Sequence, residues 1–227
     1  KLKKCCVMGK NSTTKWAENL TKEVYKKWKR IGKPKAGFRV FYGPVTPKPK
    51  LMIISLNPGG SKKYFDKDKR KYENGDFSLP LENFYLKRKN RFGKMIMKLF
   101  KGNESVMEES VITTVLLFRS HDLDQLKRNK KKYAEIKEFA NKKVKEIIEV
   151  IRPKKILVIG NGTFDKMKSI QLIHNEKKLK KFGSSGTILR AKTDHYDILV
   201  LPHVSAAHGL TCRHRGIMKK HLKRFIK

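Results

Sequence analysis

The sequence predicts an α/β domain, a three-layer α/β/α sandwich with a short central, mostly parallel four-stranded sheet. The main observation is a set of continuous apolar runs at residues 51–56, 110–118, 155–160 and 198–202. Such runs are typical of strands buried on both faces of a parallel sheet. Segments with amphipathic helical spacing separate them, as in proteins whose helices cover both faces. A length of 227 residues suits a single domain.

The N-terminal region is expected to contain a basic helix over residues 14–30. Large apolar side chains recur there at helical spacing, namely Trp16, Leu20, Val24 and Trp28. We assign residues 1–36 to this basic helical extension and residues 37–227 to the core. The sequence leaves open whether the helix packs into the core or acts as a separate arm.

The remaining connections and helices follow from the same spacing. Residues 61–89 are charged and aromatic, with turn signals at Asn74-Gly75 and Pro80, and predict mostly loop with one short helix. Amphipathic spacing predicts helices at residues 91–100, 133–151 and 216–226. Residues 189–191 could add an antiparallel strand.

The net charge is the strongest compositional signal. The chain has 56 Lys and Arg residues against 20 Asp and Glu residues, a formal charge of +36. This excess favours a polyanionic partner, with double- or single-stranded DNA expected before an anionic membrane surface. A generally lysine-rich composition is the alternative, but it does not explain why acidic residues fail to balance the lysines. No apolar run approaches the roughly 18 residues of a membrane-spanning helix.

The number of cysteines indicates the cellular compartment and limits the possible cofactors. Three cysteines, Cys5, Cys6 and Cys212, do not form a disulfide framework and are too few for an ordinary iron–sulfur cluster. We therefore expect a reducing, cytoplasmic location, associated with the nucleoid in a prokaryote, and we see no signal peptide. The expected state is a monomer that requires no metal or cofactor.

Polar side chains follow two of the predicted strands. Asn57 comes directly after the first strand and His203 directly after the last. Ligands of open parallel sheets bind at the carboxyl ends of strands. An amide there can orient a water molecule, and a neutral imidazole can donate to an oxygen that becomes negative.

Several short motifs together resemble the uracil-DNA glycosylase superfamily. Ser55-Leu56-Asn57-Pro58-Gly59 is similar to its first motif, G-[IM]-N-P-G, and His203-Val204-Ser205 resembles the H-P-S start of its second motif. Asn90-Arg91-Phe92-Gly93-Lys94 resembles the N-R-F-W-K segment of the mismatch-specific branch. Residues 112–119 resemble the L-N-T-V-L-T-V-R strand of the uracil-cleaving enzymes. The chain is identified as a divergent member, closest in motifs to the mismatch-specific and single-strand-selective branches.

This resemblance implies a monofunctional DNA glycosylase that flips a base and hydrolyses its N-glycosidic bond. Asn57 would position the water and His203 would stabilise the departing base. The implied base-binding residues are Ser55, Leu56, Pro58, Gly59, Phe77 and Thr113. The implied DNA-binding residues are Gly60, Ser61, Asn90, Arg91, Ser205, His208, Gly209, Leu210 and Arg213. Phe77 would stack on the base, with Phe84 and Tyr85 behind it, and Leu210 would be the wedge that enters the duplex.

Three departures from the motifs affect the expected substrate. Ser55 replaces the usual Gly, Val204 replaces Pro, and Thr113 stands where the uracil-cleaving enzymes have an Asn that reads the base. A single hydroxyl cannot copy the two-point contact of an amide. Plain uracil is therefore a doubtful target, and a larger modified base, as in phage DNA, is one alternative. The role that the resemblance implies is either base excision repair or defence against phage DNA that carries modified bases.

Simpler interpretations stay open for several of these residues. Asn57 to Gly60 could be only a turn, and the aromatic residues of 61–89 could simply pin that segment to the core. His203, His208, Cys212 and His214 could bind zinc, although they lack a tight two-plus-two ligand pattern. Alternative functions are a non-catalytic nucleic-acid-binding module and, more weakly, a Mg²⁺-dependent nuclease, which lacks the clustered carboxylates that two-metal hydrolysis needs.

Overall fold

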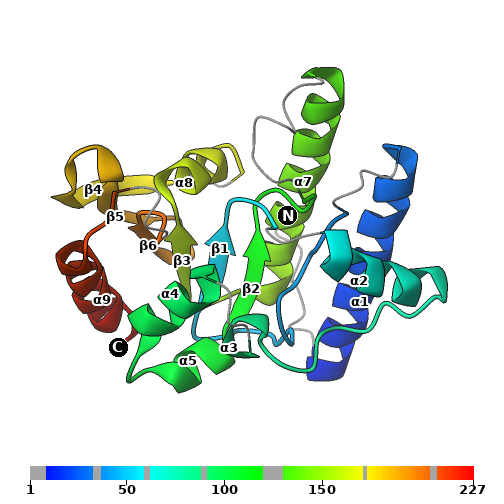
Figure 1. Ribbon diagram of the computed structural model, residues 1–227, viewed down its shortest axis with the longest axis horizontal. Coiled ribbons are helices and arrows are strands. Elements are labelled where there is room, and N and C mark those ends of the chain that lie inside the picture. Colours follow the sequence, from blue (N-terminus) through cyan, green and yellow to red (C-terminus); the bar gives the residue numbers. More distant parts are fainter. Residues whose placement is uncertain are drawn as a thin grey trace.

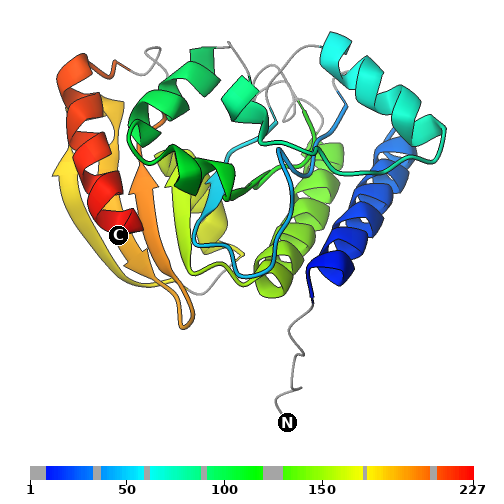
Figure 2. The same cartoon turned by 90° about the horizontal axis from the view of Figure 1, so that it is seen from below.

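A computed structural model describes residues 9–32, 37–58, 62–87, 91–119, 130–170, 173–204 and 209–227, and for residues 62–64, 87 and 91 the backbone only. Helices cover both faces of a central sheet (Figures 1 and 2), as the three-layer prediction requires. None of the helices in these ranges combines the length and apolar character needed to cross a bilayer.

The sheet has six strands in the order β2-β1-β3-β6-β5-β4, so the prediction of four strands was wrong. The predicted apolar runs form the parallel part: β1 (Met52–Ser55), β2 (Val111–Thr114), β3 (Lys155–Ile159) and β6 (Asp197–Leu201). Two further strands, β4 (His174–Lys181) and β5 (Thr187–Lys192), extend the sheet in antiparallel orientation. The suggested antiparallel strand at residues 189–191 is confirmed as part of β5. The apolar pattern missed β4 because most of its side chains are exposed, four of them lysines.

Alternate strand residues divide the interior into two cores. Side chains such as Met52, Ile54 and Val158 join a first core under α1 (Lys10–Arg30), α7 (Lys130–Ile151) and α8 (Asn161–Lys168). Side chains of the opposite face, such as Ile53 and Leu157, join a second core. That core lies under α3 (Phe84–Lys87), α4 (Arg91–Phe100), α5 (Glu104–Glu108) and α9 (Cys212–Ile226).

The N-terminal helix α1 packs into the first core rather than standing apart from it. Ala17, Leu20, Val24 and Trp28 are buried there with the sheet residues. Beside α7, the indole Nε1 of Trp16 donates to Glu146 over 3.1 Å, and Lys27 pairs with Glu135. The question that the sequence left open is therefore settled in favour of packing.

Residues 62–87 hold more helix than predicted. The helix α2 (Lys62–Glu73) occupies most of the segment expected to be loop, and Gly75, at φ 78°, follows its end. α2 is fixed by its few apolar residues: Phe65 is 1% exposed and packs edge-on against Phe38. The high charge of α2 hid this pattern, because its exposed turns carry alternating acids and bases.

Residues 37–42 run antiparallel to the chain that leaves β2. Phe38 and Phe118 form an isolated bridge, and the Arg39 amide donates to the Leu117 carbonyl over 2.9 Å. This segment covers the outer edge of β2, and α2 packs against it. Arg39 pairs with Asp68 of α2, and the fully buried Arg119 lies 3.8 Å from the same carboxylate.

Candidate active site

The carboxyl ends of β1 and β6 lie at the same edge of the sheet, separated by β3. All three strands are parallel, with Ile53 opposite Leu157 and Leu157 opposite Leu199. Asn57 stands two residues beyond the end of β1, and His203 two residues beyond the end of β6. Strands are about 4.8 Å apart, so the two strand ends are separated by ~10 Å, which leaves room for a planar ring between the two side chains.

The turn that carries Asn57 is held by the chain leaving β2. The amide of Val115 donates to the Ser55 carbonyl and that of Leu116 to the Leu56 carbonyl, each over 2.9 Å. Pro58 is buried, whereas Ser55, Leu56 and Asn57 are half-buried. The hydrogen bonds to the Ser55 and Leu56 carbonyls fix the backbone before Asn57. The half-exposed Asn57 side chain therefore extends from a fixed position.

A glycine allows His203 to lie close to the end of β3. Gly160 has φ 99°, and its amide donates to the Leu201 carbonyl over 2.7 Å. A Cβ at this position would lie 3.2 Å from Thr163 Oγ1 and 3.9 Å from the Cβ of His203. The sequence showed only a glycine after an apolar strand, and it did not indicate this contact.

The imidazole of His203 is supported by a series of aromatic rings. Its centroid lies 5.4 Å from that of Phe92 in α4, and the Phe92 ring lies 5.5 Å from Tyr85. Tyr85 in turn stacks on Tyr42 at 5.4 Å. The sequence indicated Phe92 only as part of a motif and gave no signal for its contact with His203, which makes Phe92 a further candidate residue of the site.

Two predicted base-binding residues, Thr113 and Phe77, contact other residues of the protein. Thr113 is fully buried, and its hydroxyl donates to the Val40 carbonyl over 2.8 Å. Phe77 is half-buried and stacks on Tyr72 at 5.5 Å, with Tyr25 at 5.6 Å. The Phe77 contacts match the simpler interpretation that these rings pin the segment to the core. A base-binding role for Thr113 or Phe77 stays a prediction.

The chain beyond His203 returns quickly to the core. Val204 is fully buried, and Leu210 is 4% exposed in the second core, with its carbonyl bonded to Arg215 over 2.7 Å. In this conformation the Leu210 side chain is not available to enter a duplex. Gly209 and Arg213 are exposed beside it.

Several predicted site residues are not part of the described structure. Gly59, Gly60, Ser61, Asn90, Ser205 and His208 lie outside the described residues, and of Arg91 only the backbone, at the start of α4, is described.

The structure shows no preformed metal site within its described ranges. No group of three or more His, Cys, Asp and Glu side chains there could hold a metal ion. His214, one of the residues considered for zinc, instead takes part in the N-terminal cap of α9 with Thr211 and stacks on Phe182 at 4.5 Å. His208, which completes the suggested set, lies outside the described residues.

A cavity of about 1110 Å³ lies between α2 and residues 39–41. Arg39, Tyr72 and Phe84 are among its lining residues, whereas Asn57 and His203 are not. Burial, followed by the charge of Asp68, raises the pKa of Tyr72, so its phenol stays protonated near neutral pH. Burial, followed by Arg39, lowers the pKa of Arg119.

These features define an α/β protein with an amide and an imidazole at the ends of the two strands that flank β3, and comparison with known families agrees. Residues 42–225 match the uracil DNA glycosylase superfamily, so the chain belongs to that superfamily. The predicted resemblance is therefore confirmed at this level, while the branch is not determined. No curated protein matches the chain significantly. Superfamily membership makes DNA the expected partner.

Proposed function

We propose that the protein is a monofunctional DNA glycosylase that removes a damaged or modified base and leaves an abasic site. The observation that carries this proposal is the position of Asn57 and His203 at the carboxyl ends of β1 and β6, in a chain of this superfamily. The reaction flips the nucleotide out of the stack, so that its base occupies the space between the two side chains.

The chemistry follows from the two side chains. The Asn57 carbonyl oxygen orients a water molecule toward the sugar C1′. The C1′–N bond breaks, its electron pair stays on the base, and His203 donates a hydrogen bond to the base oxygen that becomes negative. Water adds to C1′, its proton passes to solvent, and the released base takes up a proton. Phe92 positions the imidazole throughout, because its ring lies against that of His203.

The target base is proposed to be larger than uracil. Thr113 replaces the base-reading amide of the uracil-cleaving enzymes, and its hydroxyl already bonds to Val40. A pocket without that two-point contact loses discrimination for the pyrimidine edge. A bulky modified cytosine, as in phage DNA, is the substrate class that we propose, which would give the enzyme a role in defence. Mismatched thymine, hypoxanthine and uracil are the competing targets.

The test is a base-release assay without added metal on DNA carrying each of these bases, with abasic sites revealed by alkali. Release from one substrate should be lost in Asn57→Ala while DNA affinity stays near that of the parent protein. Asn74→Ala, in the exposed turn after α2, is the matched control and should retain full activity. Full activity of Asn57→Ala would refute the proposed role of the amide.

A second candidate function is a non-catalytic DNA-binding module. The observation that favours it is the internal engagement of Thr113 together with the substitutions at Ser55 and Val204. It predicts salt-dependent DNA binding without release of any base. Strand scission that requires Mg²⁺ without a preceding abasic site would point instead to a nuclease.

A further inference from the structure

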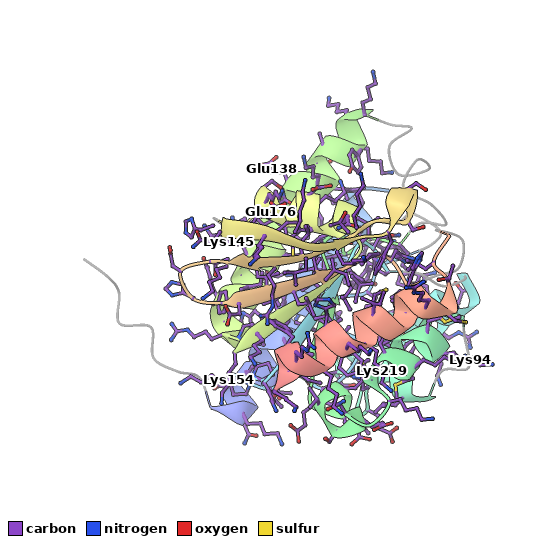
Figure 3. The ribbon with its side chains drawn as sticks, turned by 90° about the vertical axis from the view of Figure 1, so that its left-hand side faces the viewer. Lys94, Glu138, Lys145, Lys154, Glu176 and Lys219 are labelled. Carbon is purple, nitrogen blue, oxygen red and sulfur yellow. The ribbon has the colours of Figure 1, made fainter. Side chains whose placement is uncertain are left out.

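The hairpin of β4 and β5 lies at one side of the sheet, beyond the four parallel strands (Figures 1 and 3). Its outer strand, β4, is rich in lysine. Lys177, Lys178, Lys180 and Lys181 of β4 are all exposed. In the register of the hairpin, Lys177 lies opposite Arg190 and Lys180 opposite Ile188. Lys178 lies opposite Leu189, and Lys181 opposite Thr187. Because Ile188 belongs to the second core and Leu189 to the first, the lysines lie on both faces of the edge strand.

The positive charge of this region is not balanced by acidic residues. Residues 174–192 contain six basic residues and one acid, Glu176, which pairs with Lys168 over 2.7 Å. The helix α9 has six basic residues and no acidic one. The four β4 lysines form no ion pair with the part of the chain that the structure describes.

On the opposite side of the molecule, several lysines form ion pairs. Lysines of α1 and α7 pair with glutamates there: Lys27 with Glu135, Lys143 with Glu23 and Glu146, and Lys145 with Glu149. A uniformly lysine-rich composition predicts the same balance on both sides. The balance differs: one acidic residue stands against twelve basic ones on the hairpin and α9, whereas six stand against fourteen on α1 and α7.

Cationic side chains are also packed together between the hairpin and α9. The Arg190 guanidinium lies 4.6 Å from the centre of the Phe225 ring, over which Lys155 also lies. Burial, and then the charges of Arg224 and Arg190, lower the pKa of His221. Like charges held together repel, and a bound polyanion relieves that repulsion.

The β4 lysines reach the end of the sheet at which Asn57 and His203 lie. Both β4 and β6 are antiparallel to β5, so the carboxyl ends of β4 and β6 lie at the same edge. The turn between β4 and β5 is fixed there, because the Asn161 side chain bonds to both backbone groups of Thr187 over 2.8 and 3.0 Å. At Gly186, an added Cβ would lie only 3.0 Å from Pro202, next to His203.

We propose that the β4 lysines, with Arg190 and Arg224, bind the phosphate backbone of duplex DNA that flanks the reacting nucleotide. The position of that nucleotide rests on the proposed function, whereas the DNA contact itself does not. Residues 177–181 extend about 13 Å along the strand. One strand of a duplex places about four phosphates in that length, which matches the number of lysines on this edge strand, two on each of its faces.

The test uses the full chain with the four β4 lysines replaced, K177Q/K178Q/K180Q/K181Q. DNA affinity is measured against salt concentration on a duplex that carries a central abasic-site analogue with flanks of roughly 10 base pairs, about one helical turn. Each lost phosphate contact removes about 0.9 from the slope of log K against log salt, so the slope should fall by about 2 to 4. A matched control, K10Q/K15Q/K26Q/K50Q, removes four exposed lysines from other parts of the molecule and should change the slope by less than about 1.

Shortening the flanks locates the contact. The parent protein should lose affinity when one flank, but not the other, is cut to a few base pairs, and the quadruple variant should be insensitive to both. An unchanged slope in the quadruple variant, or an equal fall in the control, would overturn the proposal, as would a loss confined to single-stranded DNA. Base release by the parent protein is measured separately, so a failure of the proposed reaction is distinguished from a failure of the hairpin contact.

Discussion

The ring of His203 lies 5.4 Å from the ring of Phe92, with an angle of 34° between their planes. The two residues are more than a hundred positions apart, and they meet because α4 packs over the face of the sheet that carries the second core. The contact restricts how the imidazole can tilt. In the proposed reaction the imidazole must point at one oxygen of the departing base, so its orientation is part of the site.

Replacing Phe92 with Leu should therefore slow base release without weakening DNA binding. Small misplacements of a catalytic group cost up to about 100-fold, and we expect a fall of about 10- to 100-fold in the single-turnover rate. Phe92→Tyr keeps the ring and should retain most of the activity. Equal rates for the parent protein and Phe92→Leu would show that the imidazole does not depend on this ring.

Gly160→Ala should reduce both stability and base release. Its φ of 99° is unfavourable for a side chain, and the added methyl would meet Thr163 and approach His203. Strain of this kind costs about 1 to 3 kcal/mol, which thermal denaturation would detect. Gly162→Ala, in the same helical segment but with open space around it, is the control and should stabilise the protein by up to about 1 kcal/mol. A neutral Gly160→Ala would contradict the close approach.

Asp68→Asn should strongly destabilise the fold. Arg39 pairs with this carboxylate and the buried Arg119 lies 3.8 Å from it, so the substitution removes one negative charge shared by two arginines. Leaving buried charge uncompensated costs about 3 kcal/mol or more. Urea denaturation measures the loss. Asp66→Asn changes an acid two residues away that forms no ion pair with the described residues, and it should stay within about 0.5 kcal/mol of the parent protein. Equal effects of the two variants would mean that the arginines do not depend on Asp68.

His221 should make the stability and the DNA affinity respond to pH in opposite directions. Burial and the adjacent Arg224 and Arg190 lower its pKa below the ordinary 6.5, so the unfolded chain binds the proton more readily. Its contribution to folding stability is therefore present above pH 6.5 and is lost as the pH falls through 6.5 toward the lowered pKa. Nearby DNA phosphates should raise the pKa, so affinity should increase on acidification.

An NMR titration of the imidazole signals, with and without duplex DNA, measures this effect. His221→Gln assigns the signal and should remove the corresponding part of the pH dependence of both stability and affinity. A pKa of His221 that does not change on DNA binding would argue against phosphates near Arg190 and Arg224, and hence against the hairpin contact.

The sequence predicted the parallel part of the sheet because residues buried on both faces must be continuously apolar. The runs that became β1, β2, β3 and β6 show this pattern. The prediction failed for β4, an edge strand with four exposed lysines, and for α2, whose apolar residues are few among many charged ones. Burial leaves a sequence pattern only where a whole face is apolar, so exposed elements carry a weaker signal.

The candidate site divides in the same way. The sequence by itself placed Asn57 and His203 at strand ends, because a buried strand stops abruptly where polar residues and turn residues begin, and it determined the excess of positive charge. Only the tertiary structure decided that Phe92 and Gly160 lie close to His203 and that the Thr113 hydroxyl bonds to the Val40 carbonyl. It also decided which lysines lie near a carboxylate. The physical reason is that these contacts join residues far apart in the chain, and local patterns of polarity do not record how layers pack against one another.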